Sequence, residues 1–241
     1  MKDSDRNSIG TNWGWELSFE VASYTLLLDI FLSVCLNLIL ISISVQTKFQ
    51  ILGSPYGTAI LGASEVFLLI PVLIYSKKFS ISRDQLGIRF GNWTKIMKDV
   101  VLGVTIGILM VPISMISSEL NELVLGPQPQ SGYIKGSLTA SSLFELSLLL
   151  FSIVFVVVPV EETIIRGFIQ QGFEGSFGSL KGLVSSSLIF AFMHLDAWSI
   201  LPLMVLGMML GLCFRLRHNR LLAPIISHAL YMVYLVASVS F

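Results

Sequence analysis

Charged residues are scarce in this chain of 241 residues, because Asp, Glu, Lys and Arg together make up only 12% of it. A soluble domain carries about 25% charged residues. Hydrophobic residues reach 54% and the mean hydropathy is +0.81. The shortage of charge argues against a soluble globular protein. It predicts an all-α fold, a polytopic bundle of transmembrane helices.

Net charge and cysteine are also lacking. The 15 Lys and Arg balance the 15 Asp and Glu, so no excess of positive charge suggests a nucleic-acid partner. The two cysteines, Cys35 and Cys213, lie in apolar runs and lack the spacing of a disulfide framework or a metal site. We interpret both as small buried hydrophobic side chains. Membrane lipids are the first partners that this composition implies.

A cleavable signal peptide is not evident at the start of the chain. Residues 1–20 are polar, and the first apolar run, 21–45, is too long for the apolar part of a signal peptide. We expect residues 1–20 to form a cytoplasmic N-terminal segment and residues 21–241 to form one membrane-embedded helical domain. The catalytic core of that domain is expected at about 140–235.

Seven apolar runs are long enough, or nearly so, to cross a hydrocarbon core of about 30 Å. They lie at 21–45, 57–75, 97–118, 141–173, 180–195, 198–214 and 221–241. The fifth and sixth runs are short, so the number of spans is expected to be about seven, within a range of six to eight. The Pro- and Gly-rich segment 126–132 predicts a loop.

Basic residues gather in two of the loops between these runs. The two sets are Lys77, Lys78, Arg83, Arg89 and Lys95, and Arg215, Arg217 and Arg220. Cytoplasmic loops carry an excess of Lys and Arg, so both loops and the N-terminus are expected in the cytoplasm. With seven spans the C-terminus is outside. The composition is typical of a prokaryotic chain, which predicts a multi-pass protein of the prokaryotic plasma membrane.

Among the ionisable side chains inside these apolar runs, where a charge costs a few kcal/mol or more, five stand out. They are Glu161, Glu162, Arg166, His194 and His228. A chain that keeps such residues at membrane depth usually needs them for function. They are therefore the candidate site.

The spacing of three of these residues predicts that they meet. Glu161 is 14 residues before Gly175, and His194 is 16 residues after Gly178, with a turn expected between the two glycines. At 1.5 Å per residue both side chains lie about 21–24 Å from that turn. The preceding helix must then be long and tilted or kinked, with Pro159 as the expected kink. His228 is 8 residues past Arg220, or about 12 Å, and helix tilt can close the remaining gap.

The two glutamates are expected to differ in role. Adjacent helical residues point about 100° apart, so their carboxylates do not share a helix face. Arg166 follows Glu162 by four residues, the order that favours an ion pair. Glu162 then pairs with Arg166, while Glu161 is free to face His194 as a general base.

Three motifs at these residues resemble those of a known family, the CPBP intramembrane proteases. This family includes the type II CAAX prenyl endopeptidases and bacteriocin-processing or immunity proteins. Its Glu-Glu-x-x-x-Arg motif reads Glu161-Glu162-Thr-Ile-Ile-Arg166, and its Phe-x-x-x-His motif reads Phe190-Ala-Phe-Met-His194. The third motif, a late histidine, matches at His228, but Met232 stands where the family usually has Asn or Asp.

The resemblance implies an intramembrane endopeptidase that cleaves a membrane-associated peptide or protein near the cytoplasmic face. It implies that Glu161 and His194 activate a water and that His228 stabilises the oxyanion. Glu162 and Arg166 support the site, and Phe190 orients the imidazole. Met232 removes one expected oxyanion donor, for which Tyr231 or a backbone amide can substitute.

Cofactor and activity both leave alternatives open. Glu161, His194 and His228 are a legitimate zinc set with an open fourth position. A metal-free site is slightly favoured, because these residues come from three helices without a tight His-x-x-x-His pair. The alternative function is a catalytically weakened membrane binding or immunity protein of the same fold, which Met232 supports. A transporter is disfavoured, because no inverted repeat is visible.

Three further acidic residues stand in or near the apolar runs. We expect Asp29 and Glu145 near the membrane interfaces. Glu65 lies deeper and is expected to face an internal cavity, with no assigned role.

Overall fold

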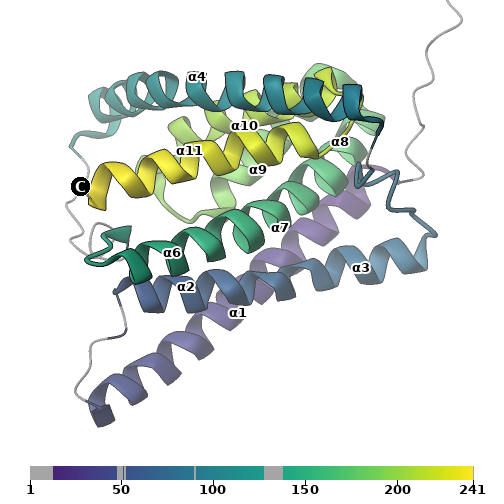
Figure 1. The fold of residues 1–241 in the computed structure, drawn as a ribbon. Coiled ribbons are helices and arrows are strands. Elements are labelled where there is room, and N and C mark those ends of the chain that lie inside the picture. Colours follow the sequence, from purple (N-terminus) through teal and green to yellow (C-terminus); the bar gives the residue numbers. More distant parts are fainter. Residues whose placement is uncertain (1–12, 48–50, 52, 90, 128–137, 241) are drawn as a thin grey trace, which may run out of the picture.

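The computed structural model describes residues 13–47, 51, 53–89, 91–127 and 138–240. Every regular element in these ranges is helical, which confirms the predicted all-α fold (Figure 1). Residues 1–12 of the expected N-terminal segment and residues 128–132 of the expected loop lie outside the described part of the chain.

The N-terminal half forms three long helical runs. They consist of α1 (Trp15–Thr47), of α2 (Pro55–Ser64), η1 (Glu65–Leu68) and α3 (Leu69–Lys78) in one continuous run, and of α4 (Trp93–Leu125). Each of these runs is long and apolar enough to cross a membrane. They agree with the first three spans expected from hydropathy.

The C-terminal half begins with one continuous run of 35 residues, Leu143–Phe177. Its parts are α6 (Leu143–Ser152), η2 (Ile153–Val157), α7 (Val158–Glu162), η3 (Thr163–Gln170) and α8 (Gln171–Phe177). The remaining elements are α9 (Ser179–Met193), η4 (Ala197–Ser199), α10 (Ile200–Leu216) and α11 (Leu222–Ser240). Six helical runs among the described residues can therefore span a membrane, within the expected six to eight.

The helix expected at 180–195 is shorter than a span. α9 has 15 residues and is about 22 Å long, whereas the hydrocarbon core is about 30 Å thick. It begins after Gly178, whose φ of 80° turns the chain sharply at the predicted position. It ends at His194 and Leu195, where Leu195 has a φ of 53°. His194 therefore stands where the chain turns back toward α10.

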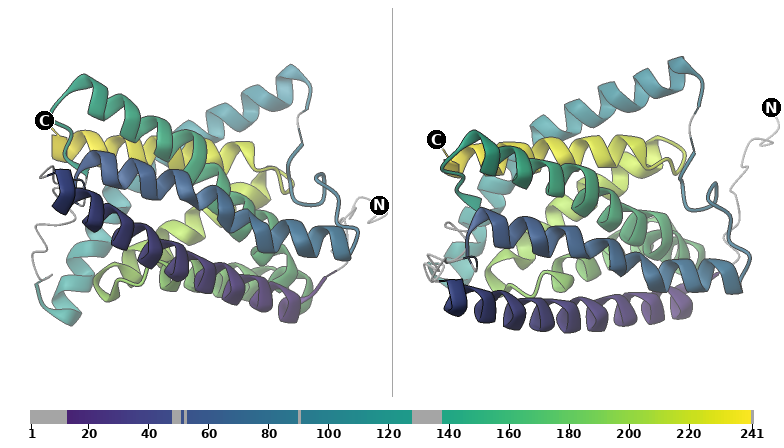
Figure 2. Two further views of the ribbon diagram at one scale, coloured as in Figure 1. Left: turned by 90° about the horizontal axis from the view of Figure 1, so that it is seen from below. Right: turned by 60° about the horizontal axis from the view of Figure 1, so that its bottom comes forward.

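The long helices lie side by side, with α1 crossing them at an angle (Figure 1). The right-hand view of Figure 2 shows α1 along the outer side of the bundle. α11 contacts both α4 and α7, while α9 packs between α8 and α10. This arrangement brings together α7 and α11, which carry Glu161 and His228, and the C-terminal end of α9, which His194 follows.

Paired glycines allow two of these helix contacts to be close. A Cβ on Gly103 would lie 2.8 Å from the carbonyl oxygen of Ala223, and one on Gly107 would lie 3.0 Å from the carbonyl oxygen of Ser227. Gly207 and Gly211 are spaced in the same way on α10, where Gly207 faces Ser187 of α9. Small residues four apart let membrane helices approach closely. Both pairs therefore set the positions of the helices that carry His228 and His194.

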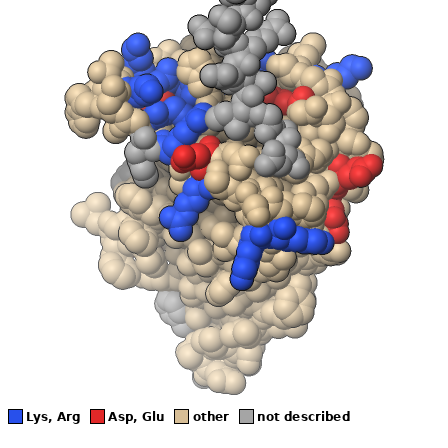
Figure 3. Space-filling view, turned by 90° about the vertical axis from the view of Figure 1, so that its right-hand side faces the viewer, with Lys and Arg blue, Asp and Glu red and all other residues tan. Residues whose placement is uncertain are grey.

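The two basic loops meet at one end of the bundle, where Figure 3 shows Lys and Arg side chains together. The amide of Leu221 donates to the carbonyl of Gly87 at 3.1 Å, which joins the loops directly. Asp99 of α4 is buried there and pairs with Arg217 and Arg220. The loops thus share one end, as the sequence predicts, while its assignment to the cytoplasm stays a prediction.

Candidate active site

The helix that carries both glutamates has widened turns on either side of them. η2 precedes Pro159 and η3 follows Glu162, and both are π-helical. Pro159 lacks an amide hydrogen, so a widened turn before it is a natural way to keep the chain helical. Such π-segments occur frequently at functional sites. Here they leave Glu161 and Glu162 on a short α-helical segment whose residues face the interior.

Glu162 and Arg166 form the ion pair that their spacing predicts. Arg166 Nε lies 3.4 Å from Glu162 Oε2, and both side chains are buried. Arg166 also donates from Nη2 to the carbonyl oxygen of Gly207 at 3.3 Å. Its guanidinium lies 4.6 Å from the centre of the Phe190 ring, a cation–π contact. The pair therefore ties η3 to α9 and α10.

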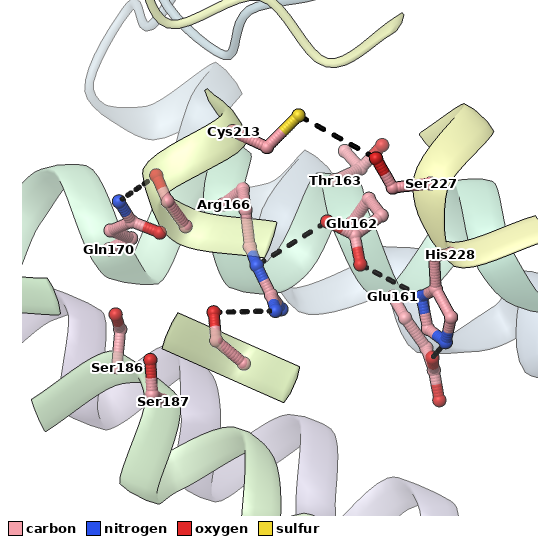
Figure 4. A network of polar contacts seen from close by, with 12 residues as sticks. Glu161, Glu162, Thr163, Arg166, Gln170, Ser186, Ser187, Cys213, Ser227 and His228 are labelled. Atoms are coloured by element: carbon pink, nitrogen blue, oxygen red, sulfur yellow. Dashed lines mark hydrogen bonds and ion pairs between the residues drawn. The ribbon is translucent and has the colours of Figure 1, made fainter. Parts of the chain in front are cut away.

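Gln170, which the sequence motifs did not indicate, repeats the same contact one turn later. Its Nε2 donates to the carbonyl oxygen of Gly211 at 3.2 Å, as Arg166 does to Gly207. Arg166 and Gln170 are four residues apart on one helix, and Gly207 and Gly211 are four apart on the other. Figure 4 shows this polar network. The sequence signal for this contact is a shared spacing of four residues. Two polar side chains have this spacing on one helix, and two glycines have it on the other.

His228 lies against both glutamates. Its Nδ1 lies 2.9 Å from Glu162 Oε1, and its Nε2 lies 3.7 Å from Glu161 Oε2. Figure 4 shows Glu162 between Arg166 and His228. A carboxylate paired with Arg166 can only accept, so the His228 Nδ1 carries a hydrogen. The ring is thereby oriented with Nε2 toward Glu161.

His194 is oriented in a comparable way by its own helix. Its Nδ1 lies 2.8 Å from the carbonyl oxygen of Phe190, and its Nε2 lies 3.9 Å from Glu161 Oε1. A carbonyl only accepts, so Nδ1 donates and Nε2 of the neutral ring has a lone pair facing Glu161. The Phe190 ring contacts both imidazoles edge-on, at 4.8 Å from His194 and 6.1 Å from His228. The structure thus brings Glu161, His194 and His228 together, with the Phe190 ring in contact with both imidazoles.

A cavity of about 420 Å³ opens beside the two histidines. Tyr231 and Met232 line it together with His194 and His228, and most of its remaining wall is apolar. Its lining extends to Glu122, near the end of α4 that is remote from the basic loops. Met232 therefore stands in the cavity wall next to His228.

A second cavity of about 330 Å³ lies on the other side of His194 and is lined by Glu161, Glu65 and Asp29. The expectation that Glu65 faces an internal cavity agrees with this. The expected position of Asp29 near a membrane interface stays a prediction, while Asp29 lines the same cavity from within α1. Hydropathy could not predict this, because it does not say toward which neighbour a helix turns its polar residue.

Metal ligation finds no support in the geometry. Among the described residues, no group of three or more His, Cys, Asp and Glu side chains is arranged to hold a metal ion. Glu161 and the two imidazoles supply suitable donor types, but they do not fit a bound zinc ion as they are placed. We therefore derive no step through a metal.

Comparison with protein families gives one match. Residues 143–234 match the family described as Type II CAAX prenyl endopeptidase Rce1-like, which confirms the resemblance found in the motifs. The matched range contains Glu161, His194 and His228. The comparison with curated proteins and that with solved structures gave no match. The family and the six apolar helices together support a CAAX-type protease integral to the membrane.

Proposed function

Because residues 143–234 match the family described as Type II CAAX prenyl endopeptidase Rce1-like, we propose that this chain hydrolyses a peptide bond within the membrane. Glu161, His194 and His228 carry out the reaction. The observation that carries the proposal is the approach of both imidazole Nε2 atoms to one carboxylate, at 3.9 and 3.7 Å. Those side chains come from three helices and stand between two cavities.

The attacking group is a water held by Glu161 and His194. The Glu161 carboxylate and the Nε2 lone pair of His194 are both acceptors, and at 3.9 Å they make no direct hydrogen bond. A water beside them can donate one hydrogen to each. As its oxygen attacks the peptide carbonyl carbon, Glu161 takes the proton and later passes it to the leaving amine.

His228 stabilises the oxyanion of the tetrahedral intermediate. Its Nδ1 hydrogen is held by Glu162 at 2.9 Å, so this role requires the doubly protonated ring, which carries its second hydrogen at Nε2. That N–H faces the reacting centre and donates to the developing oxyanion. Glu162 and Arg166 are positioning residues. Glu162 orients His228, and Arg166 contacts the Phe190 ring.

The substrate is a membrane-associated peptide or protein whose backbone passes Glu161. The cavity beside His228 is mostly apolar and lies among membrane-spanning helices, so it suits a segment that is itself in the membrane. Cleavage near the cytoplasmic face stays a prediction. The lining of this cavity runs instead toward the end of α4 remote from the basic loops.

A catalytically weakened binding or immunity protein is the second candidate, and Met232 favours it. A methionine in the cavity wall beside His228 cannot donate the hydrogen bond of the Asn or Asp usual in the family. Loss of one oxyanion donor lowers the rate by about 10²–10³, which still leaves an enzyme. The two candidates therefore differ in rate rather than in fold.

The test compares peptides released from membranes that contain the wild-type chain, Glu161→Gln or His194→Ala. We expect mass spectrometry to find new peptide termini with the wild type that both variants lose. Glu119→Gln is the control for the carboxylate, because Glu119 is exposed on α4. His218→Asn is the control for the imidazole, since His218 lies in the loop between α10 and α11.

Two outcomes would decide against a protease. Either the wild type gives no new termini, or both site variants keep every terminus that the two controls keep. A biological function that survives Glu161→Gln without any peptide release would favour the binding protein.

A further inference from the structure

The cavity of about 330 Å³ beside Glu161 is acidic. Three carboxylates from three separate elements line it: Asp29 from α1, Glu65 from η1 and Glu161 from α7. No Lys or Arg stands among the described residues that line it. The volume is about ten times that of one water molecule, so it has room for a side chain.

Glu65 is the unusual member of this acidic cavity. Its Oε2 atom is shielded from solvent and has no hydrogen-bond partner among the described residues. No Lys or Arg in the described part of the chain lies within ion-pair distance of Glu65 or Asp29, although Ser33 donates to Asp29 at 3.5 Å. A buried carboxylate without a partner is costly. The Oε2 atom of Glu65 is thus available to a donor that the described part of the chain does not supply.

The cavity's position suggests what that donor is. Glu161 and His194 face the acidic cavity, and His194 and Phe190 also line the larger, mostly apolar one. A peptide cleaved at Glu161 must place the residues that flank the scissile bond into these two spaces. One flanking side chain therefore enters apolar surroundings and the other meets two carboxylates beside the reacting centre.

We propose that Asp29 and Glu65 bind a cationic side chain, a lysine or an arginine, that flanks the scissile bond of the substrate. This inference rests on the proposed protease function and names its substrate class. An ammonium or guanidinium in this cavity supplies the missing donor to Glu65 and relieves the repulsion between the carboxylates. Asp29 and Glu65 hold the cation, so Glu161 remains free to bind the attacking water.

The experiment uses the full-length protein in phosphatidylcholine vesicles with an equimolar peptide mixture, and mass spectrometry locates the cleavage sites. We expect Lys and Arg to be enriched at one position next to the scissile bond. With a matched pair of peptides that carry Lys or Gln there, Glu65→Gln should lower kcat/KM for the Lys peptide about ten- to a hundredfold. The change should appear mainly in KM, and the Gln peptide should be affected little.

Further variants test whether the preference for Lys or Arg depends on the charge in the acidic cavity. Asp29→Asn should act in the same direction as Glu65→Gln, while Glu119→Gln should keep the preference because Glu119 is exposed on α4. Glu65→Lys should shift the preference from basic to acidic residues. Cleavage that depends on Glu161 but shows no enrichment of Lys or Arg, or enrichment that survives both neutral variants, would overturn the inference and leave the proposed function standing.

A second measurement tests the cavity without peptide cleavage. Ser33→Cys is placed on the cavity wall of a chain in which Cys35 and Cys213 are replaced by Ala. We expect a cationic aminoethyl methanethiosulfonate to label it at least tenfold faster than the anionic sulfonatoethyl reagent. Glu65→Gln together with Asp29→Asn should abolish that ratio. Equal rates in the parent protein would overturn the inference, whereas absence of Glu161-dependent cleavage alone would overturn the protease function.

Discussion

His228 Nδ1 lies 2.9 Å from Glu162 Oε1, so a side chain of α11 is held by one at the end of α7, 66 residues earlier in the chain. The same Glu162 pairs through its other oxygen with Arg166 at 3.4 Å. One buried carboxylate thus joins the late histidine to the helix that carries Glu161. This link makes the orientation of His228 depend on a side chain that need not touch the substrate.

Glu162→Gln should therefore destabilise the protein as well as slow it. The substitution leaves the buried guanidinium of Arg166 without its counter-charge, which costs about 3–5 kcal/mol. Thermal unfolding in detergent measures the loss. The double variant Glu162→Gln with Arg166→Met should recover much of the stability, because no unpaired charge remains. A double variant less stable than Glu162→Gln would contradict the ion-pair explanation.

Phe190→Leu should lower activity more than a neighbouring substitution does. It removes the ring that contacts His194 and His228 edge-on and lies under Arg166. Each aromatic contact contributes about 0.5–1.5 kcal/mol beyond burial, so we expect about a tenfold fall in kcat. Phe192→Leu is the matched control, because Phe192 is exposed on the same helix. Equal effects of the two variants would contradict the role of Phe190.

Met232→Asn should raise the rate of peptide hydrolysis. Met232 and His228 line the same cavity and are four residues apart on α11, so an amide at this position can donate toward the same oxyanion. The gain can reach about 10²–10³ in kcat, measured in single-turnover experiments. Should Met232→Asn leave kcat unchanged while Tyr231→Phe lowers it, Tyr231 would be the donor that replaces the missing one.

Gly103→Ala should loosen the contact between α4 and α11. The added Cβ would lie 2.8 Å from the carbonyl oxygen of Ala223, and backbone cannot move away as a flexible side chain can. Overpacking of this kind costs about 1–3 kcal/mol, which the midpoint of thermal unfolding reports. Val104→Ala, at a more exposed neighbour, should cost less. A Gly103→Ala variant as stable as the wild type would show that α4 and α11 can move apart without a loss of stability.

Phenanthroline should leave peptide hydrolysis unchanged. The proposed mechanism holds the water between Glu161 and His194 and needs no metal, because the acceptors already present can orient and deprotonate it. The measurement is the cleavage rate of one peptide before and after incubation with the chelator. Inhibition that is reversed by added zinc would indicate that Glu161, His194 and His228 are metal ligands.

The spans, the hairpin and the Glu162–Arg166 pair are local features that the sequence alone determines. Long apolar runs must be helical in lipid because every backbone group has to be satisfied internally. The turn near Gly178 follows from local backbone chemistry, and the spacing of four between Glu162 and Arg166 puts them on one face of a helix. These features sufficed to predict that Glu161 and His194 share a depth.

Only the tertiary structure decided which faces of the helices meet. Hydropathy measures how apolar a run is and does not specify its rotation about its own axis, so it could not bring Asp29 and Glu65 to Glu161. It also could not predict the widened turns of η2 and η3, which rotate the glutamates relative to a regular helix. The acidic cavity arises from three helices that are far apart in sequence, and packing alone brings them together.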